Sequence, residues 1–213
     1  MALPLERQSQ AERRSRSEDA LLDAAAELIA ERGIQGASLA SIGSRAGVSR
    51  GLPNHHFGSK DALVARLAQR AQNRIGLEMQ EARRSQSERV GRLSALDEIF
   101  LNVDAYLKMF ENPTADERAL LVMWGSTFPS GASVDDGMED AERRSYEGLS
   151  RLITLGQQDG SVRADADPIA TAVLLHGLMR GLAALTVADS GLTDMSGVRK
   201  TCRDWVSSSL ATR

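Results

Sequence analysis

Apolar residues recur at intervals of three and four along almost all of this chain, and this spacing constrains its fold more than any other feature. Such spacing places apolar side chains on one face of a helix, whereas a strand needs alternation. Neither alternating β-branched or aromatic runs nor an Asn-Gly hairpin turn occurs in the sequence. The 213 residues, 42% of them hydrophobic and 26% charged, are sufficient for a packed core. We therefore expect an all-α fold of about nine helices.

The first residues predict an arm followed by a helix. Residues 1–16 are polar, carry four arginines and have no apolar face, which is typical of a flexible basic arm. Ser17 is expected to cap the first helix and Gly33 to end it. Arginine and glutamine stand where a signal peptide needs an apolar stretch, and the single Cys202 cannot form an internal disulfide. Both features favour a cytoplasmic protein.

A helix-turn-helix is expected next. Ser38 is positioned to cap a short helix that Gly47 ends, because glycine readily adopts the left-handed conformation of a helix C-terminus. Ser49 is expected to cap a second helix that reaches about His56. Two short helices joined by a tight turn are typical of DNA-binding units.

The charge of this segment supports the same interpretation. No Asp or Glu occurs from Arg32 to Lys60, although the chain has 29 acidic residues and a formal net charge of −3. The chain as a whole is thus unsuited to coat nucleic acid, but this segment concentrates positive potential locally.

The rest of the sequence predicts longer helices with recognisable starts. The first begins at Ser59 and the second covers Leu96–Phe110. The third follows a capping box at Thr114–Glu117, and the fourth covers about 138–155. The fifth runs from Asp167 and Pro168 to Ala188, and the last from about Asp194 to Leu210. The segment Ile169–Ala188 is apolar enough for a membrane helix. Because it contains His176 and Arg180, we expect a helix buried in a protein core instead.

The segment SLASIGSRAGVSRGLPNHHFGSKDALV, residues 38–64, resembles the DNA-binding domain of the TetR family. The resemblance is carried, in order and without gaps, by Ile42, Ala46–Ser49, Gly51, His55–Phe57, Ser59–Lys60 and Leu63. A second stretch, GQQDGSVRADADP at residues 156–168, is similar to the turn before the penultimate helix of that family. Two departures stand out. Pro53-Asn54 replaces the usual Leu-Tyr, so the tyrosine that contacts the DNA backbone is missing, and Gly43 replaces a common alanine.

The resemblance implies a DNA-binding domain at 17–63 and an effector-binding and dimerisation domain at 64–213. The implied partners are double-stranded operator DNA, a small-molecule effector and a second copy of the chain, with no membrane, cofactor or metal. The implied function is a repressor that binds a near-palindromic operator as a homodimer and is released by the effector.

Within the helix-turn-helix, Arg50 is the predicted base contact, because a guanidinium can bond guanine O6 and N7, although a phosphate contact is the alternative. Leu52 could contact a thymine methyl group. The predicted DNA-binding set is Ser38, Ser49, Arg50, Gly51, Leu52, Asn54, His55, His56 and Lys60. A metal site at the adjacent histidines is not expected, because neighbouring side chains on a helix point about 100 degrees apart.

Effector and dimer contacts are predicted on the C-terminal helices. The resemblance implies a pocket, and its candidate residues are aromatic, methionine and polar: Tyr106, Phe110, Met123, Trp124, Phe128, Tyr146, His176, Met179 and Arg180. For each of them a place in the core is the alternative, and taken singly it is the more frequent one. Arg180 needs a partner, which could be an internal acid, a dimer contact or an anionic ligand, and we favour one of the first two. The candidate dimer interface comprises Gly177, Leu178, Gly181, Leu185, Val198, Cys202, Trp205 and Val206. The alternative is that this face packs within one subunit.

Two other classes of function occur among helical proteins of this size. A helical enzyme is not expected, because no glycine-rich phosphate loop, metal-spaced cluster or nucleophile motif is present. A helical adaptor that binds protein and keeps the helix-turn-helix only as scaffold is the main alternative, and the acid-free segment argues against it.

Overall fold

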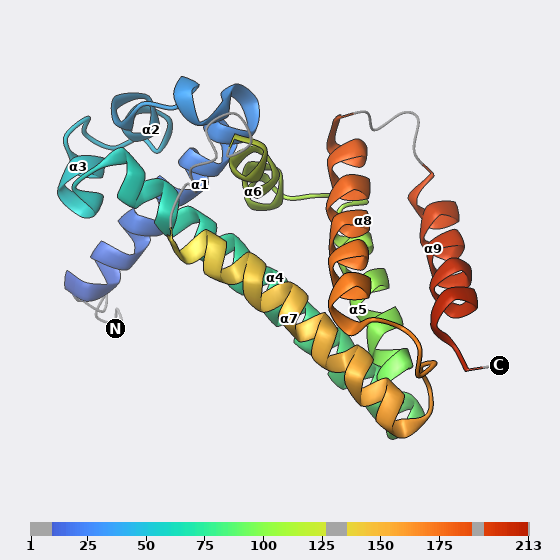
Figure 1. The fold of residues 1–213 in the computed structure, drawn as a ribbon. Helices are drawn as coiled ribbons and strands as arrows, with labels where there is room; N and C mark the ends of the chain where they lie inside the picture. The colour runs from blue at the N-terminus through green and yellow to red at the C-terminus, as the bar shows by residue number, and fades with distance from the viewer. Residues whose placement is uncertain (1–9, 127–135, 189–193, 213) are drawn as a thin grey trace.

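The computed structural model describes residues 10–126, 136–188 and 194–212. Within these residues the chain forms nine α-helices and no strand. The helices are α1 (Gln10–Gly36), α2 (Leu39–Arg45), α3 (Leu52–Phe57), α4 (Lys60–Val90), α5 (Ala95–Met109), α6 (Ala115–Ser126), α7 (Asp136–Asp159), α8 (Pro168–Ala188) and α9 (Met195–Leu210). The long helix α4 joins a head, formed around α1–α3, to a body that contains α5, α7, α8 and α9 (Figure 1). The predicted all-α fold of about nine helices is confirmed.

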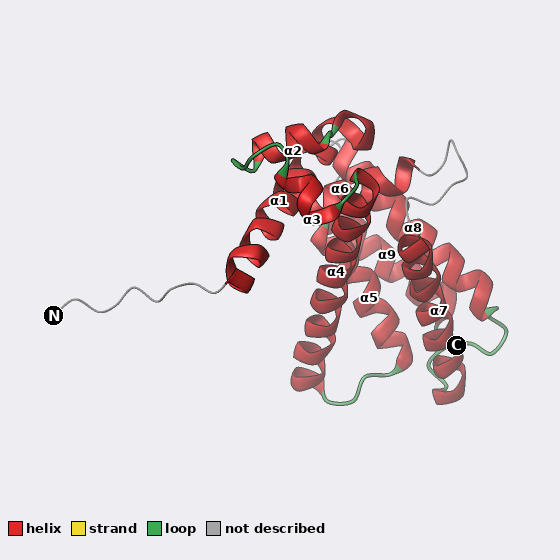
Figure 2. Cartoon of the chain, turned by 90° about the vertical axis from the view of Figure 1, so that its left-hand side faces the viewer, coloured by secondary structure: helices red, strands yellow, loops and turns green. Residues whose placement is uncertain are grey.

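The head has its own apolar core. Leu21 and Ile29 of α1, Ile42 of α2 and Leu63 of α4 are almost completely buried in it, and α6 contributes Met123. Helix α6 packs against α1, and Figure 2 shows it beside the head helices. The head core thus includes a helix from much later in the chain. The predicted domain boundary after residue 63 falls inside the continuous helix α4.

The first helix starts earlier than the sequence predicts. It begins at Gln10, so residues 10–16 are helical, and the Ser17 hydroxyl donates to the carbonyl of Arg13 at 3.0 Å instead of capping. The physical reason is that extending an existing helix costs little and that Ala, Glu, Arg and Gln favour it even without an apolar face. Residues 1–9 of the predicted arm lie outside the described residues. Gly33 interrupts α1 with a φ of 72°, which fits the predicted stop.

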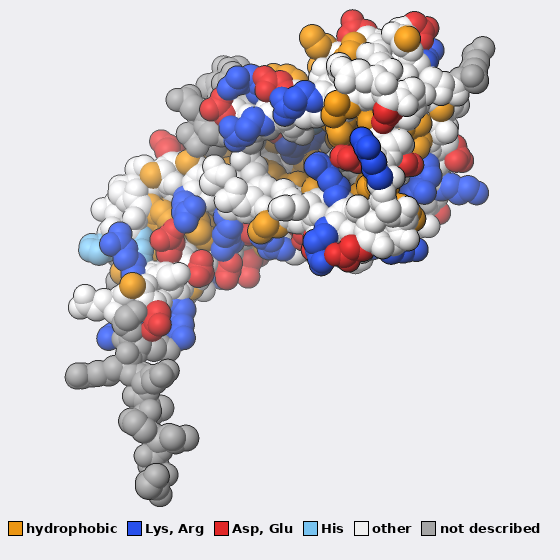
Figure 3. Space-filling view, turned by 90° about the horizontal axis from the view of Figure 1, so that it is seen from below, with side chains coloured by type: hydrophobic (Ala, Val, Ile, Leu, Met, Phe, Trp, Pro, Cys, Tyr) orange, Lys and Arg blue, Asp and Glu red, His pale blue; other side chains and the backbone are white. Residues whose placement is uncertain are grey.

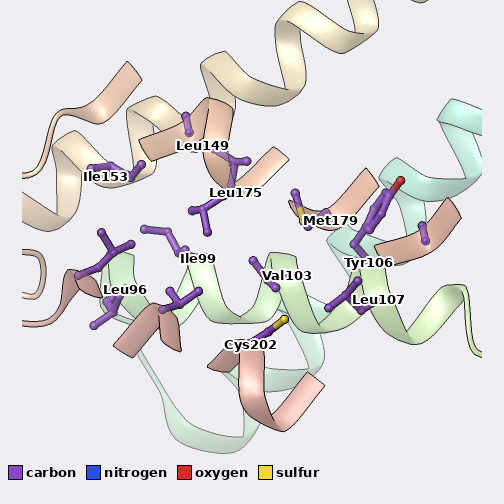
Figure 4. Packing of buried hydrophobic residues seen from close by; sticks show 14 of the residues in the cluster. Leu96, Ile99, Val103, Tyr106, Leu107, Leu149, Ile153, Leu175, Met179 and Cys202 are labelled. Atoms are coloured by element: carbon purple, nitrogen blue, oxygen red, sulfur yellow. The ribbon is translucent and has the colours of Figure 1, made fainter. Parts of the chain in front are cut away.

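The body encloses the second core. Helix α5 presents Leu96, Ile99, Val103 and Leu107 to it, which is the stripe that the sequence predicts, and Cys202 of α9 points to the same core (Figure 4). Apolar residues of α7 and α8 pack against the other sides of this core.

Helix α8 is buried on one face only. By length and composition it could cross a membrane, and a third of its most apolar window is buried in the protein. Ala172, Leu175 and Ala183 pack into the body core, whereas Ile169 and Leu185 are exposed. The prediction of a buried helix is therefore wrong for the outer face, which leaves an apolar surface to be explained.

Candidate nucleic-acid interface and body cavity

The two short helices of the head are held by local sequence signals. Ser38 caps α2, because its hydroxyl oxygen accepts from the Ser41 N–H at 3.1 Å while its own N–H donates to the Ser41 hydroxyl at 3.0 Å. Gly47 ends the helix with a φ of 70°, a left-handed conformation that glycine adopts without strain. Both signals were predicted from the sequence and are confirmed.

The contact between α2 and α3 is unusually close at Gly43. A Cβ placed there would lie 3.1 Å from Pro53 Cγ and 3.2 Å from the Ser49 carbonyl oxygen. Any side chain here would push α3 away from α2.

Helix α3 starts at Leu52 and not at Ser49, which corrects the predicted boundary. Gly51 is the N-cap residue and has no side-chain cap, while the Ser49 carbonyl accepts from the Leu52 N–H at 3.0 Å in the preceding turn. Pro53 explains the difference. If Ser49 were the cap, proline would occupy the fourth helical position, where an N–H is needed and the ring would clash with the Ser49 carbonyl. In the observed helix Pro53 lies in the first turn, where its missing N–H has no helical partner.

The predicted DNA-binding residues surround the start of α3. Of these, Ser38, Ser49, Arg50, Gly51, Asn54 and His55 are exposed, whereas Leu52, His56 and Lys60 are half-buried. Leu52 packs against the head core, so only part of its side chain faces outward. The rings of His55 and His56 meet edge to face, 5.9 Å apart. Histidine and basic side chains lie together at this end of the molecule (Figure 3).

The basic residues of this region have different surroundings. Arg45 binds Glu27 at 2.8 Å and Glu31 at 3.1 Å, so it joins α2 to α1 and its charge is balanced. Its hydrogen bond lowers the pKa of Glu31. Arg50 and Lys60 form no ion pair with any residue that the structure describes. The free positive charge therefore lies at the turn before α3 and at the start of α4.

This geometry defines a DNA-binding unit of the helix-turn-helix class. Comparison with known proteins identifies its family. Residues 21–67 match the sequence model of bacterial regulatory proteins of the tetR family. The chain therefore carries the DNA-binding domain of the TetR family, as residues 38–64 predict.

Individual proteins agree with this assignment. The HTH-type transcriptional regulator BetI of Paraburkholderia phytofirmans is 46% identical over 44 residues, which cover 21% of this chain and 23% of that protein. The chain thus aligns with less than a quarter of the length of the curated relatives it matches. These relatives are transcriptional regulators and not enzymes.

The overall fold is also similar to solved structures. A TetR transcriptional regulator from Chloroflexus aurantiacus has a TM-score of 0.75 and 16% identity, covering 94% of this chain and 99% of its own. AibR, solved with isovaleryl coenzyme A and operator DNA, has a TM-score of 0.73 and 13% identity, covering 89% and 97%. At these identities the likeness establishes the fold.

A cavity of about 620 Å³ lies in the body and is lined from α4, α5, α6, α7 and α8. Of the residues predicted for a pocket, Tyr106, His176, Met179 and Arg180 line it. Phe110 and Met123 do not; Phe110 is buried in the body core and Met123 in the head core.

The other predicted pocket residues lie elsewhere. The half-buried Trp124 packs against the head core, with its ring 5.6 Å from the Arg180 guanidinium. Tyr146 packs against the body core, with its ring 6.3 Å from that of His176. Phe128 lies outside the described residues. The lining residues that sequence reasoning missed include Gln72, Arg83, Arg144 and Arg151.

Arg180 has an internal partner. It forms an ion pair with Glu142 of α7, whose second carboxylate oxygen lies 2.6 Å from His176 Nε2. Burial raises the pKa of Glu142, but the hydrogen bond with His176 and the charge of Arg180 outweigh it, so this pKa is lowered overall. Sequence reasoning missed Glu142, because nothing local relates it to a residue 38 positions later.

The outer face of α8 differs in part from the predicted dimer interface. Gly177, Gly181 and Leu185 are exposed on α8, as is Trp205 on α9, and Leu178 and Val198 are half-buried. Cys202 and Val206 belong to the body core and do not face outward. The prediction misplaced these two because α9 turns them toward α5. It missed the exposed residues Ile169, Val173 and Leu174.

Proposed function

We propose that this protein is a cytoplasmic transcriptional regulator that binds a near-palindromic operator as a homodimer and is released by a small molecule. The observation that carries the proposal is the exposed, basic start of α3 within the matched TetR domain. A helix-turn-helix places the N-terminal part of its second helix against base edges in the major groove, while flanking groups hold phosphates.

The residues at this surface have separable roles in the proposal. Arg50 is exposed and without an ion pair just before α3, so its guanidinium is available for guanine O6 and N7. Asn54 is exposed on α3 where the family commonly has tyrosine, and its amide can donate to a phosphate oxygen. Lys60 opens α4 beside the Ser59 cap and adds a charge for the phosphate backbone.

Dimerisation is supported by the outer face of α8. Ile169, Val173, Gly177, Gly181 and Leu185 are all exposed, and together they cover the outward half of the helix. A Cβ at either glycine would meet nothing within 4 Å, so packing inside one copy does not explain them. Glycines allow two helices to approach closely, and the surrounding apolar residues provide buried area, so a second α8 is the occupant that we propose.

Release by a ligand is supported by the connection between the cavity and the head. Arg70 of α4 binds Asp23 of α1 at 2.8 Å and Asp116 of α6 at 2.6 Å. Leu120 of α6 lines the cavity, and Ile75 lines it from the same helix as Arg70. A ligand that shifts α4 or α6 thus also acts on α1. A ligand that binds more tightly when the head is in one position than in another changes the affinity of the protein for its operator.

Selection of genomic DNA fragments by the purified protein tests the proposal, followed by fluorescence anisotropy of the best fragment at two salt concentrations. We expect sequence-specific binding that weakens as salt rises, because phosphate contacts release counterions. Failure to enrich any fragment, with or without added metabolite extracts, contradicts the proposal and favours the protein-binding adaptor.

A further inference from the structure

Several buried donors that line the cavity lack a partner. The Gln72 amide nitrogen, the Tyr106 hydroxyl, and Nε and Nη1 of Arg180 are buried and meet no described partner at hydrogen-bonding geometry. The Tyr106 hydroxyl does lie near the Arg180 guanidinium: burial raises the pKa of Tyr106, and the charge of Arg180 lowers it by a smaller amount. Tyr106 is 6% exposed and Arg180 is 7% exposed. A buried polar group without a partner is costly, so each such group needs an explanation. All three side chains offer N–H or O–H donors, which indicates that the cavity is built for an acceptor.

The charged residues that line the cavity are all positive. Arg83, Arg144, Arg151 and Arg180 line the cavity, and no Asp or Glu is among the lining residues that the structure describes. Glu142 balances Arg180. Arg83, Arg144 and Arg151 lie at the exposed rim and form no ion pair with a described residue, and Arg83 donates to the Asn102 amide oxygen at 2.9 Å. A bound anion is therefore favoured, whereas a quaternary ammonium would find no negative charge in the lining.

The same cavity has an apolar side. Ile75 and Met79 of α4 and Leu149 and Leu152 of α7 line it, and its volume is in the range of small-molecule sites. A ligand matched to both sides carries one anionic oxygen group and an apolar chain.

We propose that the cavity binds a monocarboxylate with an apolar chain. Its carboxylate accepts hydrogen bonds from Tyr106 and from the unpartnered donors of Arg180, with Gln72 beside them, and its chain lies along α4 and α7. This inference rests on the proposed function, because it names the class of effector that the regulator would sense.

Titration calorimetry of the full chain without DNA tests the ligand class. The probes are straight-chain carboxylates from butyrate to dodecanoate, their neutral amides, and alkyltrimethylammonium ions of equal chain length. We expect one range of chain lengths to bind as carboxylates and the matched amides to bind at least about tenfold more weakly, the value of a hydrogen bond to a charged group. Equal binding of the amides, tighter binding of the cations, or no binding by any carboxylate overturns the inference.

Two conservative variants test the residues. Tyr106→Phe removes only the unpartnered hydroxyl, and Arg180→Lys keeps a cation beside Glu142 while removing the guanidinium donors. Each should weaken carboxylate binding by about tenfold. Tyr146→Phe is the matched control, because it makes the same change on a tyrosine outside the lining, and it should bind within about twofold of the unmodified protein. Equal binding by Tyr106→Phe and Tyr146→Phe contradicts the assignment.

The stability of the ligand-free variant distinguishes a ligand-binding role of the Tyr106 hydroxyl from a structural role. Removing an unpartnered buried hydroxyl should leave the unfolding midpoint of ligand-free Tyr106→Phe unchanged or raised. A lowered midpoint would assign the hydroxyl a structural role instead.

Operator affinity is measured separately on the same proteins. Operator binding without carboxylate binding refutes this inference alone. Carboxylate binding in a protein that selects no DNA supports the inference and refutes the proposed function.

Discussion

The substitution Gly43→Ala tests whether the close contact of α2 and α3 determines the geometry of the DNA-reading head. The added Cβ would lie 3.1 Å and 3.3 Å from two atoms of the Pro53 ring and 3.2 Å from the Ser49 carbonyl oxygen. These distances are shorter than ordinary van der Waals contacts, so each must open by a few tenths of an ångström. A proline ring and a backbone carbonyl cannot rotate away, so α3 itself must move.

The free-energy change can be set against a matched glycine. Replacing a glycine by alanine inside a helix should stabilise by about 0.5 to 1 kcal/mol. Gly148 of α7 provides that reference, because its Cβ would meet only the end of Arg151, at 3.9 Å. Overpacking costs about 1 to 3 kcal/mol, so in urea unfolding Gly43→Ala should be less stable than Gly148→Ala by about that amount. A displaced α3 that loses one base contact should also weaken operator binding by about 1 to 3 kcal/mol.

A double substitution identifies the cause. Pro53→Ala removes both ring atoms that the new Cβ would meet, so Gly43→Ala should destabilise this background by about 1 kcal/mol less than it destabilises the unmodified protein. If the two substitutions are additive, or if Gly43→Ala and Gly148→Ala are equally stable, the close contact does not determine the head geometry.

Two further predictions concern the dimer and the cavity. Leu174→Asp should shift the protein from dimer to monomer in sedimentation velocity. The control Leu77→Asp changes a leucine of equal exposure on α4 and should leave the dimer intact. Equal effects of the two substitutions would place the interface elsewhere. The pKa of Glu142 is lowered when the protein is folded. The ionised carboxylate therefore stabilises the fold at pH values above its ordinary pKa of about 4.3, and this contribution is lost as the pH falls through the lower pKa of the folded state. Glu142→Gln should therefore lose less stability than the unmodified protein between about pH 5 and pH 3 in urea unfolding, and identical pH profiles would refute the interactions of Glu142 with His176 and Arg180 as the cause.

Local signals in the sequence were sufficient to predict most helix boundaries. Ser38, Ser59 and Asp194 cap the helices that follow them, and the Asp167 side chain accepts from the first N–H groups of α8. Each of these signals acts over three or four residues, so it can be recognised without knowledge of the fold. The early start of α1 has no such signal, because residues 10–16 become helical by extension of the helix that follows.

The candidate sites were predictable to a smaller extent. The surface around α3 comes from one continuous segment, so its members could be named together. The cavity combines side chains from several helices, and the partner of Arg180 is Glu142, which lies far from it in the sequence. Periodicity also cannot distinguish the inner and outer faces of α9, where Cys202 is buried and Trp205 is exposed.

The central claim, that the start of α3 reads DNA sequence, is tested most directly by operator affinity of Arg50→Ala beside Arg89→Ala. Both arginines are exposed, but Arg50 precedes α3 and Arg89 lies in the last turn of α4, away from the head. Losing a bidentate base contact should cost about 1 to 3 kcal/mol and relax preference at one position of the site. We expect this loss for Arg50→Ala and unchanged binding for Arg89→Ala. Equal operator affinity and unchanged sequence preference in Arg50→Ala would contradict the assignment of this surface as the reading head.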